Sequence, residues 1–394
     1  MHSGPIRATL RLPLTLLDAG KAPFGREVPS AAALLSPPAF QDELSWERAD
    51  SAMKVTVERA QLLKSLGHVH RVVERRNTIP ILSNILLSAE RDQLSFSATD
   101  LDMEIIDEGL AQIDIPGQIT APAHTLYEIV RKLPDGADVS LSFSGDDPRL
   151  VIQAGRSRFN LPVLPAGDFP VMSSDGLSGR IAVDTNELIR LIDKTRFAIS
   201  TEETRYYLNG LYLHTVNDGG ETKLRAVATD GHRLALAEMP APEGAVGLPG
   251  VIVPRKTIAE ARRLMESAGE TVDLQVSPQK VRFEFGAAAL TSKVIDGAFP
   301  DYMRVIPRDN AKILTLDNDL FAKAVDRVAT ISAEKSRSVK LAVEPGRITL
   351  TVRNMEAGQA GRLRRRSLRD WLQRPLPAGC LRPDRGSAGR VPLR

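Results

Sequence analysis

The sequence predicts an α+β protein in which one unit, an antiparallel sheet with two helices, occurs more than once. Segments 223–230 (KLRAVATD) and 280–286 (KVRFEFG) alternate apolar and polar residues, as half-buried antiparallel strands do. Other stretches place apolar residues at helical spacing. The whole pattern then returns along the chain, which indicates an internal repeat. Sheets with helices packed to one side form α+β domains.

The repeat is visible at several landmarks. Residues 55–66, 181–192 and 314–325 each begin with two alternating apolar residues, followed by a polar pause and a helical period. Further landmarks recur about 130 residues apart, namely Thr99 with Thr229, Pro122 with Pro254, Phe169 with Phe299 and Pro170 with Pro300. Several landmarks at one spacing predict two successive copies of one fold.

Each unit reads as a strand, a helix, several short strands, a second helix and further strands. The first unit predicts helices over 59–73 and 123–133, and the second over 185–197 and 255–267. A third unit begins near Lys312 and continues to 347–354 (RITLTVRN), where the repeat stops. The predicted fold is therefore repeated sheets with two helices each, the third copy being truncated.

The two ends of the chain differ from its body. Both tryptophans and the single cysteine lie outside residues 53–360, and the first segment shows no sustained period. Residues 361–394 hold ten arginines and two aspartates, which suits either a basic nucleic-acid tail or translation in a shifted frame, and we favour the frameshift. The chain is therefore divided into a disordered or non-native extension (1–52), unit 1 (53–178), unit 2 (179–309), a partial unit 3 (310–360) and an Arg-rich tail (361–394).

Composition narrows the possible function classes. The net charge of +3 combines +8 in the tail and −1 in residues 1–52, leaving −4 for residues 53–360, so the body would not bind nucleic acid indiscriminately. One cysteine in 394 residues excludes a disulfide framework and a cysteine metal cluster, and suits the cytoplasm. No apolar run has membrane-spanning length, and Pro13 interrupts the only stretch that resembles a signal peptide.

Residues 226–239 (AVATDGHRLALAEM) place a hydroxyl, a carboxylate, an imidazole and a guanidinium close together. If this segment is one strand, Thr229 and Gly231 face one way and Asp230 and His232 the other. A hydrolase using Asp230 and His232 is one hypothesis, but the sequence supplies no oriented base or oxyanion hole. The Thr-Asp pair also recurs at Thr99 without the histidine, which counts against catalysis, and a turn between two strands with no ligand is a further alternative.

Two groups of residues raise the question of a metal. Asp100, Asp102 and Glu104 alternate and would share one strand face, which could hold Mg²⁺ or Ca²⁺ but more often is a solvated face. His68 and His70 are two apart on a predicted helix and diverge. The sequence contains no P-loop, dinucleotide fingerprint or His-Glu-x-x-His motif, so we expect neither a metal nor a cofactor.

Long motifs in order resemble one known family. MKVTVER, TIPILSNILL, TDLDMEI, GRSRFNLPVLPAGDFP, TRYYLNGLYL, VATDGHRLALAEMP, VIVPRK and TSKVIDGAFPDYMRVIP, spread over about 53–360, resemble the bacterial DNA polymerase III beta subunits, the sliding clamps. The resemblance implies a DNA clamp fold with three similar domains per chain and two chains joined head to tail into a ring. It implies a non-catalytic processivity factor that encircles duplex DNA without reading its sequence. The implied partners are the DNA polymerase III catalytic subunit, the clamp loader and other proteins with clamp-binding motifs.

The resemblance also assigns residues. The implied peptide-docking pocket contains Leu208, Thr229, Gly231, His232, Arg233, Leu234, Pro300, Arg304 and Val305. The implied DNA contacts are Arg76, Arg205, Tyr206, Tyr207, Arg255 and Lys256, with weaker support for Arg156 and Arg158. Solvated surface cations and core tyrosines are the alternative interpretation of the DNA set. Phe169 is the expected marker of the dimer interface.

The short third unit adds an expectation about assembly. In the resembled family the first domain of one chain pairs with the third domain of the other, and a ring closes only if both surfaces exist. We therefore expect weak or absent dimerisation of this chain as written, and a truncated copy unable to close a ring is the alternative hypothesis.

Overall fold

The computed structural model describes residues 52–145, 147–173, 175–177, 179–307, 312–331, 338–344, 347–354, 358–361 and 390–393. The chain divides into two compact parts, an N-terminal part (Met1–Asp296) and a C-terminal part (Gly297–Arg394). The predicted extension lies outside the described residues except for Ala52, and so does most of the Arg-rich tail. Within the described residues, no helix is long and apolar enough to cross a membrane.

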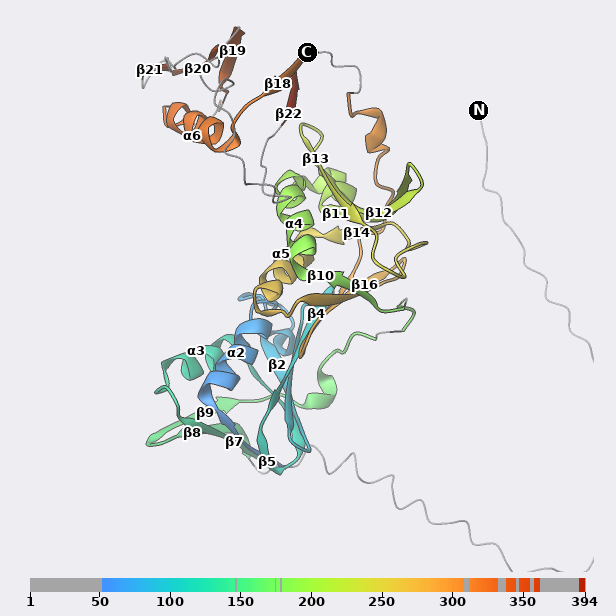
Figure 1. Cartoon of the computed structure of the whole chain (residues 1–394). Coiled ribbons are helices and arrows are strands. Elements are labelled where there is room, and N and C mark those ends of the chain that lie inside the picture. The colour runs from blue at the N-terminus through green and yellow to red at the C-terminus, as the bar shows by residue number, and fades with distance from the viewer. Residues whose placement is uncertain are drawn as a thin grey trace, which may run out of the picture. The chain divides into compact units, whose positions relative to one another are not determined.

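The first repeat opens with β1 (Ala52–Glu58), which leads directly into α2 (Arg59–Val69). Leu62, Leu66 and Val69 form the buried stripe of α2. Helix α3 (Ala123–Lys132) lies beside α2 (Figure 1). A five-stranded antiparallel sheet in the order β5-β1-β7-β8-β9 completes this layer, with β5 (Gln112–Ile115), β7 (Asp138–Ser144), β8 (Asp147–Ala154) and β9 (Ser157–Pro162).

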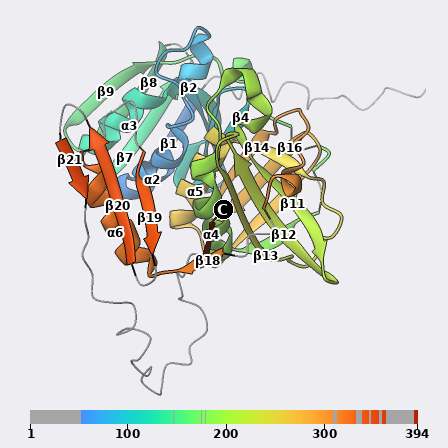
Figure 2. The same cartoon turned by 90° about the horizontal axis from the view of Figure 1, so that it is seen from above.

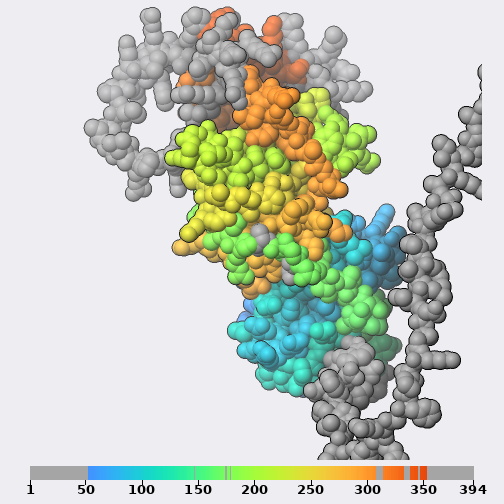
Figure 3. All heavy atoms as spheres, turned by 90° about the vertical axis from the view of Figure 1, so that its right-hand side faces the viewer, coloured from blue at the N-terminus to red at the C-terminus, as the bar shows by residue number. Residues whose placement is uncertain are grey.

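A second sheet of eight strands runs through both repeats in the order β10-β15-β16-β17-β4-β3-β2-β6. The first repeat supplies β2 (Asn84–Glu90), β3 (Gln93–Thr99), β4 (Met103–Leu110) and β6 (Gly117–Pro122). The second supplies β10 (Ile181–Asp184), β15 (Thr271–Val276), β16 (Lys280–Phe285) and β17 (Ala288–Lys293). Strands β17 and β4 are antiparallel partners, with buried Leu290 opposite buried Ile105. Atoms of the first repeat, blue to teal, therefore adjoin those of the second in Figure 3.

The second repeat repeats the first in outline. Its own sheet has the order β13-β12-β11-β14, built from β11 (Gly210–Asp218), β12 (Glu221–Thr229), β13 (Leu234–Pro240) and β14 (Val251–Pro254). Helix α4 (Thr185–Thr195) packs against β12 and β13, as Figure 2 shows, and α5 (Arg255–Leu264) follows β14 directly. Short 3-10 helices cover Arg196–Ala198, Glu203–Leu208 and Met265–Ser267.

Helix α4 begins where the sequence supplies a cap. Asp184 precedes the helix, and its carboxylate accepts a hydrogen bond from the backbone N–H of Glu187 at 2.9 Å. This satisfies one of the N–H groups that a helix leaves free at its start. Leu188, Leu191 and Ile192 then form the buried stripe. Capping and periodicity together explain why the sequence located this helix well.

The C-terminal part contains the described residues of the third repeat. Strand β18 (Lys312–Thr315) pairs with β22 (Arg390–Leu393), and β19 (Lys340–Glu344), β20 (Arg347–Asn354) and β21 (Gly358–Gly361) form a three-stranded sheet. Helix α6 (Asn318–Ala329) starts at Asp317, whose side chain accepts from the N–H of Leu320. Ala324 and Val328 of α6 pack against Leu350 and Val352 of β20. The described hydrophobic core of the C-terminal part is much smaller than that of the N-terminal part.

The four predicted helices of the first two repeats are present, with differences at their ends. Helix α2 ends at Val69 rather than at residue 73, and the Leu66 carbonyl accepts hydrogen bonds from the His70 backbone N–H and from its ring Nδ1. Predicted helix 185–197 extends into the 3-10 helix that follows α4, and predicted helix 255–267 includes the whole 3-10 helix that follows α5. Alternation and helical spacing therefore predicted the elements, while local hydrogen bonds set their limits.

Candidate functional site

The segment that resembled a hydrolase is a tight turn. Strand β12 ends at Thr229 and β13 starts at Leu234, so the segment is a turn between two strands and not one strand with two faces. Asp230 Oδ1 accepts from the N–H groups of His232 (2.9 Å) and Arg233 (3.0 Å). Thr229 Oγ1 donates to the Arg233 carbonyl (2.8 Å) and accepts from the Gly231 N–H (3.1 Å). Side chains of this kind form turns by bonding to nearby backbone groups.

The first repeat contains the same turn between β3 and β4. Asp100 Oδ1 accepts from the N–H groups of Asp102 (3.0 Å) and Met103 (2.8 Å), and Thr99 Oγ1 donates to the Met103 carbonyl (2.9 Å). The central residue has positive φ in both copies, 76° at Leu101 and 86° at Gly231. The recurring Thr-Asp pair is therefore a turn-forming pair.

The geometry does not supply hydrolase machinery at Asp230. Its Oδ2 accepts from Arg233 Nε at 2.9 Å, so both carboxylate oxygens are engaged. Partial burial raises the pKa of Asp230, but hydrogen bonds from Arg233 and His232 outweigh it and the pKa is lowered. Within the described residues, the His232 ring has no hydrogen-bond or ion-pair partner that could orient it as a base. The turn instead exposes Gly231, His232 and Arg233 to solvent.

Arg205 covers this turn. Its guanidinium bonds to Glu202 Oε2 at 2.9 and 2.7 Å and donates to the Asp230 carbonyl at 3.2 Å. A Cβ atom at position 231 would collide with Arg205 Nη1, so a larger residue there would require the end of the Arg205 side chain to move. Arg205, predicted as a DNA contact, thus lies against the predicted docking residues.

Aromatic side chains lie near the same turn. Phe197 is 56% exposed, and the Arg233 guanidinium lies 5.6 Å from the centre of its ring, within cation–π range. Phe197 was not among the residues predicted from sequence, where its only signal was an aromatic residue at the predicted end of a helix. Tyr206 is 55% exposed and meets Tyr207 edge to face. Predicted pocket residue Leu208 is only 3% exposed, and Leu234 is half-buried.

The other three predicted pocket residues belong to the C-terminal part of the chain (Gly297–Arg394). Pro300 and Val305 are exposed, the latter by 69%. Arg304 lies in the 3-10 helix Tyr302–Arg304 and pairs with Asp301 at 2.8 Å.

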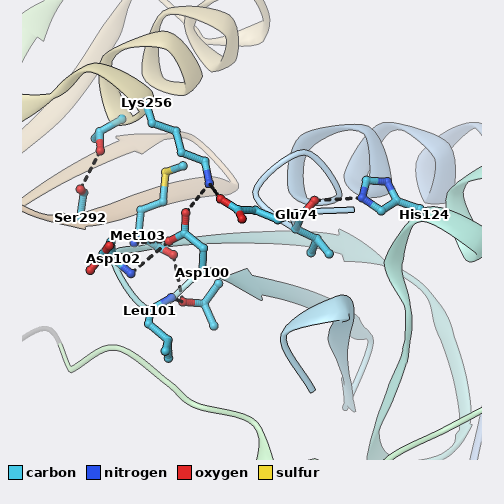
Figure 4. Close-up of polar contacts among 11 residues, drawn as sticks. Glu74, Asp100, Leu101, Asp102, Met103, His124, Lys256 and Ser292 are labelled. Carbon is cyan, nitrogen blue, oxygen red and sulfur yellow. Dashed lines mark hydrogen bonds and ion pairs between the residues drawn. The ribbon is translucent and has the colours of Figure 1, made fainter. Parts of the chain in front are cut away.

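The predicted DNA contacts fall into two classes. Arg76 and Arg255 are exposed, and neither forms an ion pair with any described residue. Lys256 instead contacts Asp100 Oδ2 at 2.5 Å and Glu74 Oε1 at 3.3 Å (Figure 4). Arg156 and Arg158 are exposed, with Arg158 on β9.

The carboxylates considered for a metal do not share one face. Asp100 and Asp102 lie in the turn, whereas Glu104 lies on β4, 2% exposed, and accepts from Ser97 Oγ at 3.0 Å. Burial raises the pKa of Glu104 despite that hydrogen bond. His68 Nδ1 contacts Asp107 at 2.9 Å. His70 stacks on Tyr127. No group of three or more potential metal ligands occurs in the part of the chain that the structure describes.

The expected interface residue is mostly buried within its own chain. Phe169 follows the 3-10 helix Ala166–Asp168 and is 6% exposed. Strand β9 is an edge of the five-stranded sheet, and its Phe159 is 38% exposed. An edge strand offers free backbone groups to another chain, and Phe159, which was not among the predicted interface residues, is exposed on this edge.

Comparison with known proteins agrees with the repeat. Three family models match in order: the DNA polymerase III beta subunit N-terminal domain at residues 53–173, its central domain at 182–301 and its C-terminal domain at 303–363. The beta sliding clamp of Caulobacter vibrioides is 96% identical over 308 residues, covering 78% of this chain and 83% of the relative. The beta sliding clamp of Escherichia coli K12 is 39% identical over 311 residues, covering 78% and 82%.

Solved structures give the same result. The DNA polymerase sliding clamp from Caulobacter crescentus is 94% identical with a TM-score of 0.75, over 79% of this chain and 83% of that one. A sliding clamp from Bartonella birtlesii bound to griselimycin is 49% identical with a TM-score of 0.76, over 79% and 83%. The third clamp domain is short here, as the repeat predicted. The chain therefore belongs to the bacterial DNA polymerase III beta subunit family, the sliding clamps that act as processivity factors in DNA replication.

Proposed function

We propose that this clamp is a non-catalytic accessory subunit that tethers the replicative polymerase by docking a short peptide beside the Thr229–Leu234 turn. The observation that carries this proposal is the turn itself. Its carboxylate is used internally, while Gly231, His232 and Arg233 are exposed next to exposed Phe197. An apolar ring bordered by a few directed polar groups is typical of a ligand site. Leu208 stays a proposed member of this site, whereas the docking role of Pro300, Arg304 and Val305, which lie beyond Asp296, stays a prediction from the family resemblance.

We propose further that duplex DNA is held through its phosphates by scattered arginines, with Arg76 and Arg255 as the leading candidates. Their guanidinium groups have no carboxylate partner among the described residues and so are available to phosphate. Contacts to phosphate carry no sequence information, which suits a protein that must slide. Arg205, Tyr206 and Tyr207 are weaker candidates, because Arg205 already pairs with Glu202. The proposed compartment is the cytoplasm, where the polymerase and its clamp loader act on the chromosome.

Peptide binding to two variants of the turn tests the docking proposal. We expect Arg233→Ala and His232→Ala each to weaken binding of a labelled peptide carrying the polymerase's clamp-binding motif by about threefold to tenfold. Fluorescence anisotropy measures this affinity. Glu243→Ala, at an exposed position in the same repeat, is the control and should bind as the unmodified chain does. Unchanged affinity in both turn variants would contradict docking at this turn.

A further inference from the structure

Two lysines of the second repeat form ion pairs with the β3–β4 turn of the first repeat. Lys256, at the start of α5, contacts Asp100 at 2.5 Å and Glu74 at 3.3 Å. Lys293, at the end of β17, contacts Asp102 Oδ1 at 3.2 Å, and its backbone N–H donates to the Asp102 carbonyl at 2.9 Å. Figure 4 shows Lys256 reaching from its helix between Asp100 and Glu74. Both outward carboxylates of this turn are thus held by the neighbouring repeat.

The twin turn of the second repeat has the same backbone bonds but a different surface. At the positions of Asp102 and Met103 it carries His232 and Arg233, which are exposed. Two copies of one turn have therefore been specialised, one for contact with a neighbouring repeat and one for a free surface.

The charge around Lys256 argues against a direct phosphate contact. The Lys256 ammonium is already paired with two carboxylates, so it is less available to a phosphate than the unpaired guanidinium groups near it. Asp100 retains only 12% side-chain exposure, so its contact with Lys256 is less screened than a surface pair. Burial lowers the pKa of Lys256, but its bonds to Asp100 and Glu74 outweigh that effect and raise it, which keeps the amine charged.

The loop that carries Glu74 is held from both repeats. From the first, His124 Nε2 donates to the Val73 carbonyl at 2.9 Å (Figure 4). From the second, Lys256 contacts Glu74. The same loop presents Arg71, Arg75 and Arg76, all exposed and without an ion pair among the described residues. Anchoring Glu74 therefore restrains three available guanidinium groups.

We propose that Lys256 is a positioning residue rather than a DNA ligand. It latches the Val73–Arg76 loop and the Thr99–Met103 turn of the first repeat to α5 of the second. The loop arginines and Arg255, the neighbour of Lys256 in the chain, thereby form one phosphate-binding surface across two repeats. The DNA part of this inference rests on the proposed function, whereas the latch itself does not.

Amide hydrogen exchange on the full chain tests the latch without DNA. Lys256→Met and Glu74→Gln should each speed exchange of the amides of residues 70–77 by about fivefold, because each removes the same anchor. Arg255→Gln, which leaves the anchor in place, should not change it. Equal exchange in Lys256→Met and the unmodified chain overturns the proposal.

The salt dependence of DNA binding separates positioning from direct contact. With a labelled linear duplex, Arg76→Gln and Arg255→Gln should each lower the slope of log K against log salt by about 1. Lys256→Met should weaken binding about threefold with the slope unchanged. A slope lowered by about 1 in Lys256→Met makes Lys256 a phosphate ligand and overturns the proposal. Unchanged slopes in both arginine variants would refute their role in DNA binding. The contact of Lys256 with the loop would still be tested by the hydrogen-exchange experiment.

Discussion

The Thr-Asp turns show how far single residues could be predicted from sequence. The pair Thr99-Asp100 recurs as Thr229-Asp230, and in both repeats it forms a turn between two strands. The sequence also allowed one strand through this segment, because apolar residues alternate on both sides of it. The positive φ at Leu101 and Gly231 is what ends the strands. A leucine gives no sequence signal of that conformation, since glycine is the residue usually found there.

At the same scale, His214 should make the clamp sensitive to acid. It stacks on Tyr212 with ring centres 4.3 Å apart, and burial, aided by Arg225, lowers the pKa of His214 to about 4. The unfolded chain binds this proton near pH 6.5, so it holds more protons than the folded chain between about pH 6.5 and 4. Stability should therefore fall as pH drops through that window, by up to about 3 kcal/mol.

Urea unfolding at pH 7 and pH 4.5 measures this loss. His214→Gln removes the ionisable group, so its free energy of unfolding should fall less between the two pH values. Identical losses in the variant and the unmodified chain would show that His214 contributes no acid sensitivity.

At the scale of elements, the predicted helix starts of the first two repeats match the structure, although only α4 has a capping side chain. Asp184 and Asp317 both precede a helix and accept from a backbone N–H three residues on. Glu58 precedes α2 without such a bond, so α2 depends on its buried stripe and on the strand before it. The contacts of Lys256 could not be predicted, because Glu74 and Asp100 are far from it in the sequence.

The cap of α4 gives a prediction with an internal control. Asp184→Ala should lower the free energy of unfolding by about 1 kcal/mol, because the Glu187 N–H loses its partner. Glu58→Ala removes a side chain at the equivalent place in the first repeat that makes no cap bond, and it should cost much less. Chemical denaturation compares the two variants. Equal costs would mean that the Asp184 bond contributes nothing to the helix.

At the scale of the whole molecule, the first repeat offers one accessible sheet edge with an exposed aromatic residue. We predict that β9, with Phe159, contacts a second copy of the chain. Light scattering should then show a mass above 43.0 kDa that rises with concentration, consistent with weak association. Phe159→Asp should keep the mass at that of one chain, because a charge would be buried in the contact.

Phe197→Asp is the matched control, since Phe197 is exposed but lies beside the docking turn. It should leave the mass of the unmodified chain unaltered. A mass of one chain at every concentration for the unmodified protein would instead fit the expectation of absent dimerisation. Loss of association in the Phe197 variant would place the contact elsewhere.

The pairing of β17 with β4 separates two kinds of continuity in this chain. The peptide that joins the repeats runs between β9 and β10, but the sheet joins them independently, strand to strand, through buried side chains on both sides. A cut in that connecting peptide would leave the backbone ladder intact. The two halves, made as separate polypeptides, should associate through this strand pairing and form the same folded structure. The first two domains of this clamp are thus joined by strand pairing as well as by the connecting peptide.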